Sequence, residues 1–239
     1  MENRTYSDVF CKVYNEFGWN YYAEIFGEQL LQWLRLKDLH PKTAMDLACG
    51  TGILCGILKD SGVEAAGMDF SEGMIRIARE ENPTIPFEVA DMITYRPEQK
   101  FDLVTCTGDA LNHIHNLEDV AKIFENISAY LREGGWFIFD LLNEREISTD
   151  EPFDLDFSDT VKAKFQMVRE GGGVCLRTTV YENGIETVRE EIRERVHDVD
   201  AICRLLEQAG LQVVRRGHSL TENAPREAAT WFIFARKMM

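Results

Sequence analysis

The 239-residue sequence predicts an α/β fold: a doubly wound, seven-stranded, mostly parallel sheet with a small antiparallel β insertion after strand five. Apolar strands alternate with amphipathic helices up to about residue 150, which is typical of a parallel sheet covered on both faces. Three polar, alternating segments joined by hairpin turns then interrupt the pattern. Hydrophobic residues make up 45% of the chain, enough for one large core.

Each expected element of the parallel sheet has a local signal. Apolar residues at helical spacing predict a helix over residues 20–37. Ser71 and Asn116 are suited to cap two of the later helices, and "REGG" at 132–135 is expected to stop the second of these. The strands are expected at residues 43–48, 63–68, 86–90, 101–106 and 136–142.

The insertion is expected at residues 157–197, where charged and apolar residues alternate. Gly171-Gly172-Gly173 and Glu182-Asn183-Gly184 are good hairpin turns. The doubly wound pattern resumes with a helix over 198–210 and two closing strands. We therefore expect one main domain formed by residues 1–150 and 198–239, with residues 151–197 standing off the main sheet.

Composition excludes several classes of partner. The net charge of −15 opposes binding to a nucleic-acid backbone or an anionic membrane surface. No apolar run approaches the roughly 20 residues that cross a bilayer, and the first residues do not read as a signal peptide. The six cysteines show no metal-ligand spacing. We expect reduced, mostly packed thiols in a cytoplasmic protein that holds no metal.

The residues that follow the strands are the candidate site, because ligands of open parallel sheets bind at the carboxyl ends of the strands. "MDLACGTG" (45–52) is a strand that ends in a glycine turn, and acids follow the next strands at Asp69 and Asp91. A nicotinamide or flavin dinucleotide site would place glycine where Cys55 stands. Asp46, inside the strand, would repel a pyrophosphate but favour an ammonium or sulfonium group.

Five segments in order resemble the motifs of class I S-adenosylmethionine-dependent methyltransferases, over nearly the whole chain. They are "MDLACGTG", "GMDFSEGMIRIARE", "VADM", "FDLVTCTGDALNHI" and "LREGGWFIFDL". The resemblance implies S-adenosyl-L-methionine as cofactor and S-adenosyl-L-homocysteine as product. It also implies cofactor contacts by the backbone near the glycine turn, by acids on the ribose and adenine, and by tyrosines near the methionyl end. The implied residues are Tyr14, Tyr22, Asp46, Ala48, Cys49, Gly50, Gly52, Asp69, Phe70, Asp91, Met92 and Thr107.

The N-terminal segment and the insertion resemble the branch that methylates small metabolites, including sugar amines and glycine-like amines. This implies that residues 1–40 form a helical cap and that residues 151–197 roof the active site. His113 is the first candidate for a base or positioning residue, Tyr14 is a second catalytic candidate, and His115 is a weaker one. Asp109 could anchor an amine or merely cap its turn. "CTGD" stands where related enzymes that methylate planar amino groups carry Asn-Pro-Pro-Tyr or Asp-Pro-Pro-Tyr, so those targets are not expected.

The expected activity is methyl transfer to a small molecule by in-line displacement, on nitrogen rather than oxygen, by a monomer or homodimer. Two alternatives stay open at this point. One is a nicotinamide-dependent oxidoreductase of similar fold, and the other is a scaffold that binds the cofactor without turnover.

Overall fold

The computed structural model describes residues 10–11, 14–15, 20–143, 151–156, 158–220 and 230–238. In these ranges no helix combines the length and the apolar character that a membrane crossing needs. All six cysteines are free thiols and five of them are buried, as expected from their spacing.

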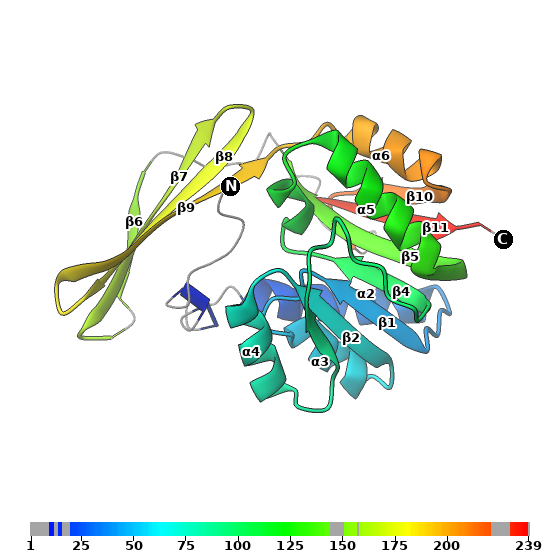
Figure 1. Cartoon of the computed structure of the whole chain (residues 1–239), viewed down its shortest axis with the longest axis horizontal. Helices are drawn as coiled ribbons and strands as arrows, with labels where there is room; N and C mark the ends of the chain where they lie inside the picture. Colours follow the sequence, from blue (N-terminus) through cyan, green and yellow to red (C-terminus); the bar gives the residue numbers. More distant parts are fainter. Residues whose placement is uncertain are drawn as a thin grey trace.

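Seven strands form the main sheet in the order β10-β11-β5-β4-β1-β2-β3 (Figure 1). Neighbouring strands from β3 to β5 are parallel, whereas β11 runs antiparallel to both β5 and β10. The predicted fold class is confirmed. The strands are β1 (Thr43–Leu47), β2 (Glu64–Asp69), β3 (Phe87–Val89), β4 (Phe101–Cys106), β5 (Leu131–Leu142), β10 (Leu211–Gly217) and β11 (Thr230–Lys237).

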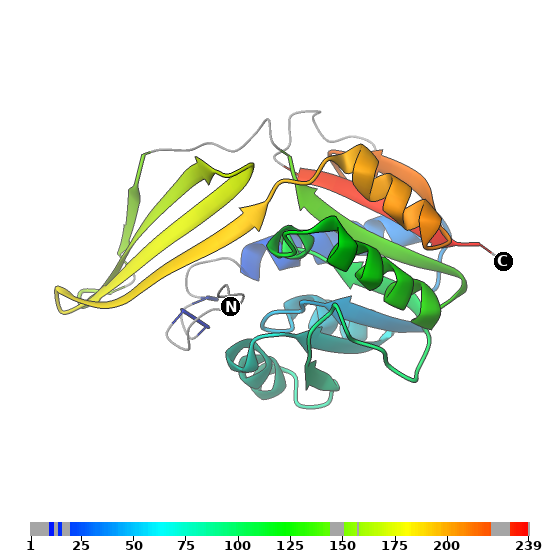
Figure 2. The same ribbon diagram turned by 45° about the horizontal axis from the view of Figure 1, so that its top comes forward.

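Helices cover both faces of this sheet, and each face has its own apolar core (Figure 2). On one face α2 (Asn20–Leu36), α3 (Ile53–Asp60) and α4 (Glu72–Glu81) pack through residues such as Leu30 and Leu58. On the other face α5 (Leu117–Tyr130) and α6 (Val199–Gln208) pack through residues such as Phe124 and Leu206. This double layer leaves the edge at the carboxyl ends of the strands available for a site.

Two predicted helix caps are present, and one predicted boundary is wrong. The Ser71 hydroxyl accepts a hydrogen bond from the Met74 amide, and the Asn116 side chain accepts from the Asp119 amide. However, β5 begins at Leu131 and includes the "REGG" segment that was expected to separate helix and strand. Leu131 already has extended backbone angles, so the chain passes from helix to strand without a loop.

The second sheet has four antiparallel strands in sequence order, one more than predicted. They are β6 (Phe153–Asp156), β7 (Val161–Glu170), β8 (Gly173–Glu182) and β9 (Ile185–Arg195). All four residues of β6 are exposed, so the segment lacks the alternation that marks a half-buried strand. The sheet projects beyond the carboxyl-end edge of the main sheet, and β9 contacts the short 3₁₀ helix η1 (Ala110–His113) (Figures 1 and 2).

Candidate active site

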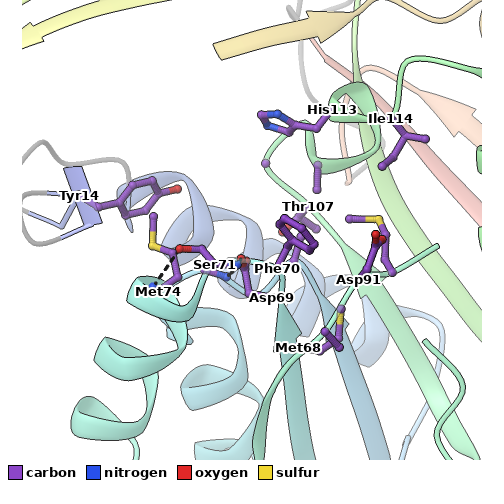
Figure 3. A pocket seen from close by; sticks show the side chains of 16 residues that line it. Tyr14, Met68, Asp69, Phe70, Ser71, Met74, Asp91, Thr107, His113 and Ile114 are labelled. Carbon is purple, nitrogen blue, oxygen red and sulfur yellow. Dashed lines mark hydrogen bonds between the residues drawn. The ribbon is translucent and has the colours of Figure 1, made fainter. Parts of the chain in front are cut away.

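One cavity lies at the carboxyl ends of β1, β2 and β4 (Figure 3). It contains about 790 Å³ of empty space, open mouth included. Strand topology brings the turns after these strands together at this edge. The predicted site residues that line the cavity are Tyr14, Ala48, Gly50, Asp69, Phe70, Asp91, Met92, Thr107 and His113.

The turn after β1 presents bare backbone to the cavity at Gly50. Gly50 has a φ of +53°, and a Cβ atom added there would meet no protein atom within 4 Å. Gly52 serves a different purpose, since a Cβ atom there would lie only 2.8 Å from the Phe87 ring. Gly50 therefore keeps the cavity side clear for a ligand, while Gly52 allows the turn to pack closely on the sheet.

Asp69 ends β2 with its carboxylate fixed at the cavity. Oδ2 accepts a hydrogen bond from the Gly50 amide at 2.9 Å, and Oδ1 accepts from the Ser71 amide at 2.8 Å. Burial raises the pKa of Asp69, and the hydrogen bonds from backbone amides oppose this rise. Each oxygen can accept a further hydrogen bond, so the anchored carboxylate is suited to bind a pair of hydroxyl groups.

The cavity also offers an aromatic face and a second carboxylate. Phe70 is 46% exposed, which is high for a phenylalanine, and its ring lines the cavity together with Asp69 and Thr107 (Figure 3). The Oδ1 atom of Asp91 accepts a hydrogen bond from the Ile93 amide at 2.9 Å. A cavity that offers both an aromatic face and a fixed acceptor is suited to a planar heterocycle that carries an amino group.

Four residues expected at the cofactor are absent from the described lining of the cavity: Tyr22, Asp46, Cys49 and Gly52. Asp46 is buried in β1, where its Oδ1 accepts a hydrogen bond from the Thr105 hydroxyl at 2.6 Å. Burial raises the pKa of Asp46 to about 7. The structure thus places Asp46 behind the turn, in a position to support it.

Tyr22 lies on α2 and contacts the end of β5. Its hydroxyl donates a hydrogen bond to Oδ2 of Asp140, which also accepts from the Gly108 amide at 3.1 Å. Oδ1 of Asp140 accepts from the Asp109 amide at 3.0 Å. Tyr22 therefore ties the N-terminal helix to the loop that follows β4.

His113 and Tyr14 both line the cavity, on different sides of it (Figure 3). Burial lowers the pKa of His113 to about 4, so its imidazole is neutral at pH 7. Burial and the nearby Asp69 and Asp109 raise the pKa of Tyr14 to about 12, so its phenol stays protonated. His115 is absent from the described lining and lies 3.0 Å from the carbonyl oxygen of Arg193.

Sequence reasoning missed two acids next to this cavity. Asp140 is the single acid in the apolar strand "WFIFDLL", a signal that could have marked it. Glu194 lies near the end of β9, and its Oε1 is 3.7 Å from Nε2 of His113. Glu194 is one of many charged residues in its strand, so nothing in the sequence distinguishes it.

The described lining of the cavity includes the carboxylates of Asp69 and Asp91 but no Lys or Arg. A phosphate or pyrophosphate would lack a cationic partner there, whereas a positively charged ligand is favoured. Within the described ranges, no group of three or more His, Cys, Asp or Glu side chains could hold a metal ion. The donor set therefore fits the positively charged, phosphate-free S-adenosylmethionine.

Two known proteins with named activities are similar to this chain. A dTDP-4-amino-2,3,4,6-tetradeoxy-D-glucose N,N-dimethyltransferase of Saccharopolyspora spinosa is 23% identical over 130 residues. That match covers 54% of this chain and 51% of the relative, so the chain spans about half of that protein's length. An amino pentose methyltransferase of Micromonospora echinaspora, solved with S-adenosylmethionine bound, superposes with a TM-score of 0.75 at 17% identity, with full coverage of both chains.

The fold as a whole matches a further solved structure. An S-adenosylmethionine-dependent methyltransferase of Clostridium acetobutylicum superposes with a TM-score of 0.81 at 22% identity, covering 95% of this chain and 99% of that one. The profile of the family described as the methyltransferase domain matches residues 14–216, which is most of the sequence. The chain therefore belongs to the methyltransferase-domain family, whose members use S-adenosylmethionine.

Proposed function

We propose that this enzyme transfers a methyl group to an amine nitrogen of a small-molecule acceptor. The observation that carries the proposal is the charge of the cavity, which offers carboxylates and bare backbone but no Lys or Arg among its described residues. That charge favours a sulfonium cofactor and disfavours a dinucleotide, which would need partners for its phosphates. The same charge favours an acceptor that carries a basic nitrogen.

Different residues of the cavity would bind different parts of the cofactor. Asp69 would accept hydrogen bonds from the ribose hydroxyls, and Asp91 would accept from the adenine amino group, with Phe70 and the Met92 backbone against the ring. The backbone at Ala48, Cys49, Gly50 and Gly52 and at Thr107 would approach the ribose and methionyl parts. Asp46 would support the turn from behind. When bound, the cofactor supplies a methyl group on a positively charged sulfur.

The acceptor would meet the methyl group near Tyr14 and His113. Methyl transfer mainly requires an aligned, desolvated nucleophile, so these two residues would orient the acceptor and exclude water. Residues 151–197 would roof this part of the site, since β9 reaches η1. Nitrogen is favoured as the acceptor atom by the charge of the cavity, and the Saccharopolyspora relative is named for transfer to nitrogen.

Calorimetric titration with S-adenosylhomocysteine and with NAD tests the cofactor. We expect S-adenosylhomocysteine to bind, with NAD at least a hundredfold weaker, and NAD binding alone would overturn the proposal. A second experiment follows labelled methyl transfer to pools of amines and of matched alcohols. Product in the amine pools supports N-methylation, and product confined to alcohols contradicts it. Tight cofactor binding without product in either pool favours the scaffold alternative.

A further inference from the structure

Three carboxylates from distant parts of the chain lie near one another and next to residues of the cavity, although none of the three is in its described lining. Asp109 follows β4, Asp140 lies near the end of β5, and Glu194 lies near the end of β9. They lie close together, because the charge of Asp140 raises the pKa of both Asp109 and Glu194, and the charge of Glu194 raises the pKa of Asp109. His113 links this group to the cavity, because it lines the cavity and lies 3.7 Å from Glu194.

The three acids differ in how well they are satisfied. Asp140 accepts hydrogen bonds from the Tyr22 hydroxyl and from two backbone amides. By contrast, Oδ1 of Asp109 is fully buried and has no hydrogen-bond partner among the described residues. Asp109 is also held at a φ of +58°, in the left-handed region that is uncommon for residues other than glycine. A buried carboxylate oxygen with no donor is costly, and burial raises the pKa of Asp109 accordingly, so a cationic donor from a ligand would stabilise its ionised form.

Neighbouring cations do not neutralise these acids. Arg193 and Arg195 flank Glu194 in sequence, but Arg193 pairs with Glu170 and Glu191, and Arg195 donates to the Gly171 carbonyl. In the described part of the chain, no Lys or Arg forms an ion pair with Asp109, Asp140 or Glu194. Burial raises the pKa of Asp140 to about 6, and burial with repulsion from Asp140 raises that of Asp109 well above its ordinary value and that of Glu194 to about 7. A positively charged ligand would favour the ionised forms of these acids.

We propose that Asp109 and Glu194 bind the amino group of the acceptor, and that Glu194 takes the proton which this group must lose. The inference rests on the proposed function and assigns a role to the second sheet, which provides Glu194. The acceptor would be a primary or secondary amine that arrives as an ammonium ion and donates one N–H to the Asp109 carboxylate. A phenol or alcohol carries no positive charge that could pair with Asp109 and Glu194.

The proton and electron balance of this step is simple. One proton passes from the ammonium to the Glu194 carboxylate, which leaves a neutral amine and a carboxylic acid. The nitrogen lone pair then forms the C–N bond as the C–S bond breaks, and its electron pair stays on sulfur. The methylated product is again an ammonium ion, paired with Asp109. Burial and Asp140 raise the pKa of Glu194 to about 7, which suits a proton acceptor at neutral pH, whereas the pKa of His113 is too low.

The test measures amine recognition without turnover. Protein saturated with S-adenosylhomocysteine is titrated at pH 7.5 and constant ionic strength with methylammonium, ethanolamine and glucosamine, and with methanol, ethylene glycol and glucose. The midpoint of thermal unfolding reports binding. We expect amines to raise the midpoint and the matched alcohols to leave it unchanged. Asp109→Asn and Glu194→Gln should each weaken the apparent amine affinity by about tenfold or more.

Glu191→Gln is the matched control, because Glu191 lies on the same strand but is exposed and paired with arginines. This variant should respond to amines as the unaltered protein does. Equal shifts with amines and alcohols, no shift with any amine, or an amine response that survives both test variants would overturn the inference. S-adenosylhomocysteine is titrated first in each sample. Its failure to bind would overturn the proposed function too, whereas its binding without amine selectivity would overturn this inference alone.

Discussion

His113 and Glu194 lie 3.7 Å apart, although one follows a strand of the main sheet and the other belongs to the second sheet. Their pKa values exchange order, since burial lowers that of His113 from 6.5 to about 4 and raises that of Glu194 from 4.5 to about 7. At neutral pH the histidine is therefore neutral, and the glutamate is the group that exchanges protons. This inverts the usual expectation for such a pair and leads to the first two predictions.

The first prediction concerns stability as a function of pH. Glu194 has an ordinary pKa of 4.5 and a folded value of about 7, so the folded state holds this proton more tightly. The stabilisation that this tightly held proton gives the folded state is fully present below pH 4.5 and is lost as the pH rises through 7. Glu194→Gln should therefore raise the free energy of unfolding at pH 8 by up to about 3 kcal/mol and change it little at pH 4.

Urea unfolding at both pH values measures this difference. Glu191→Gln is the control. The Glu191 carboxylate is exposed and Arg193 lowers its pKa, so replacing it with glutamine should not stabilise the protein at pH 8. A gain of the same size at pH 4 and pH 8 for Glu194→Gln would contradict the raised pKa.

The second prediction separates His113 from proton transfer. With an acceptor amine found in the pooled screen, His113→Ala should lower turnover while the affinity for S-adenosylhomocysteine stays within about twofold. Because His113 has a pKa of about 4, the rise of kcat/KM near pH 7 should persist in His113→Asn. Loss of that rise in the Asn variant would assign the proton acceptor to His113 after all.

The third prediction concerns Asp69. Asp69→Ala removes an acceptor that would bind two ribose hydroxyls, so S-adenosylhomocysteine affinity should fall by about 1.5–3 kcal/mol, or roughly 10- to 150-fold. Glu72→Gln, an exposed acid in the first turn of α4, is the control and should bind normally. Calorimetry on folded samples measures both, and unchanged affinity in Asp69→Ala would show that the ribose lies elsewhere.

The fourth prediction tests the bare backbone of the glycine turn. Gly50→Ala and Gly62→Ala both place a Cβ atom in open space at positive φ, so each should cost about 1–2 kcal/mol of stability. Only Gly50 lines the cavity, so only Gly50→Ala should also weaken S-adenosylhomocysteine binding, by tenfold or more. If both variants bind it equally well, the cofactor does not approach Gly50.

The residues that could be predicted from the sequence are those that directly follow a strand. Gly50, Asp69 and Asp91 needed only the strand order, because a parallel sheet brings its carboxyl ends together. Glu194 could not be predicted in this way, because its place depends on how the second sheet lies against η1. The strand β6 was missed for a related reason, since it is held by pairing with β7 and buries no apolar face of its own.

Tyr22 shows a further limit of prediction from the sequence. A tyrosine on an N-terminal helix was expected at the cofactor, but its partner Asp140 is 118 residues away and lies in an apolar strand. Helical spacing indicates which side of a helix is buried, but it does not identify the polar atom that a hydroxyl will find. The buried acid in that strand was the visible signal, and its need for donors could have predicted a partner such as Tyr22.

The fifth prediction follows from this hydrogen bond. Tyr22→Phe removes one of the three donors to Asp140, and a hydrogen bond to a carboxylate contributes about 1.5–3 kcal/mol. The bond holds the pKa of Asp140 down at about 6 against the effect of burial, so its loss should cost most where the carboxylate is charged. We expect Tyr22→Phe to be more destabilising at pH 8 than at pH 5 in urea unfolding. Tyr21→Phe, at a neighbouring residue that is 63% exposed, is the control and should change stability little at either pH. An equal loss of stability at both pH values in Tyr22→Phe would show that Tyr22 stabilises the protein by packing alone.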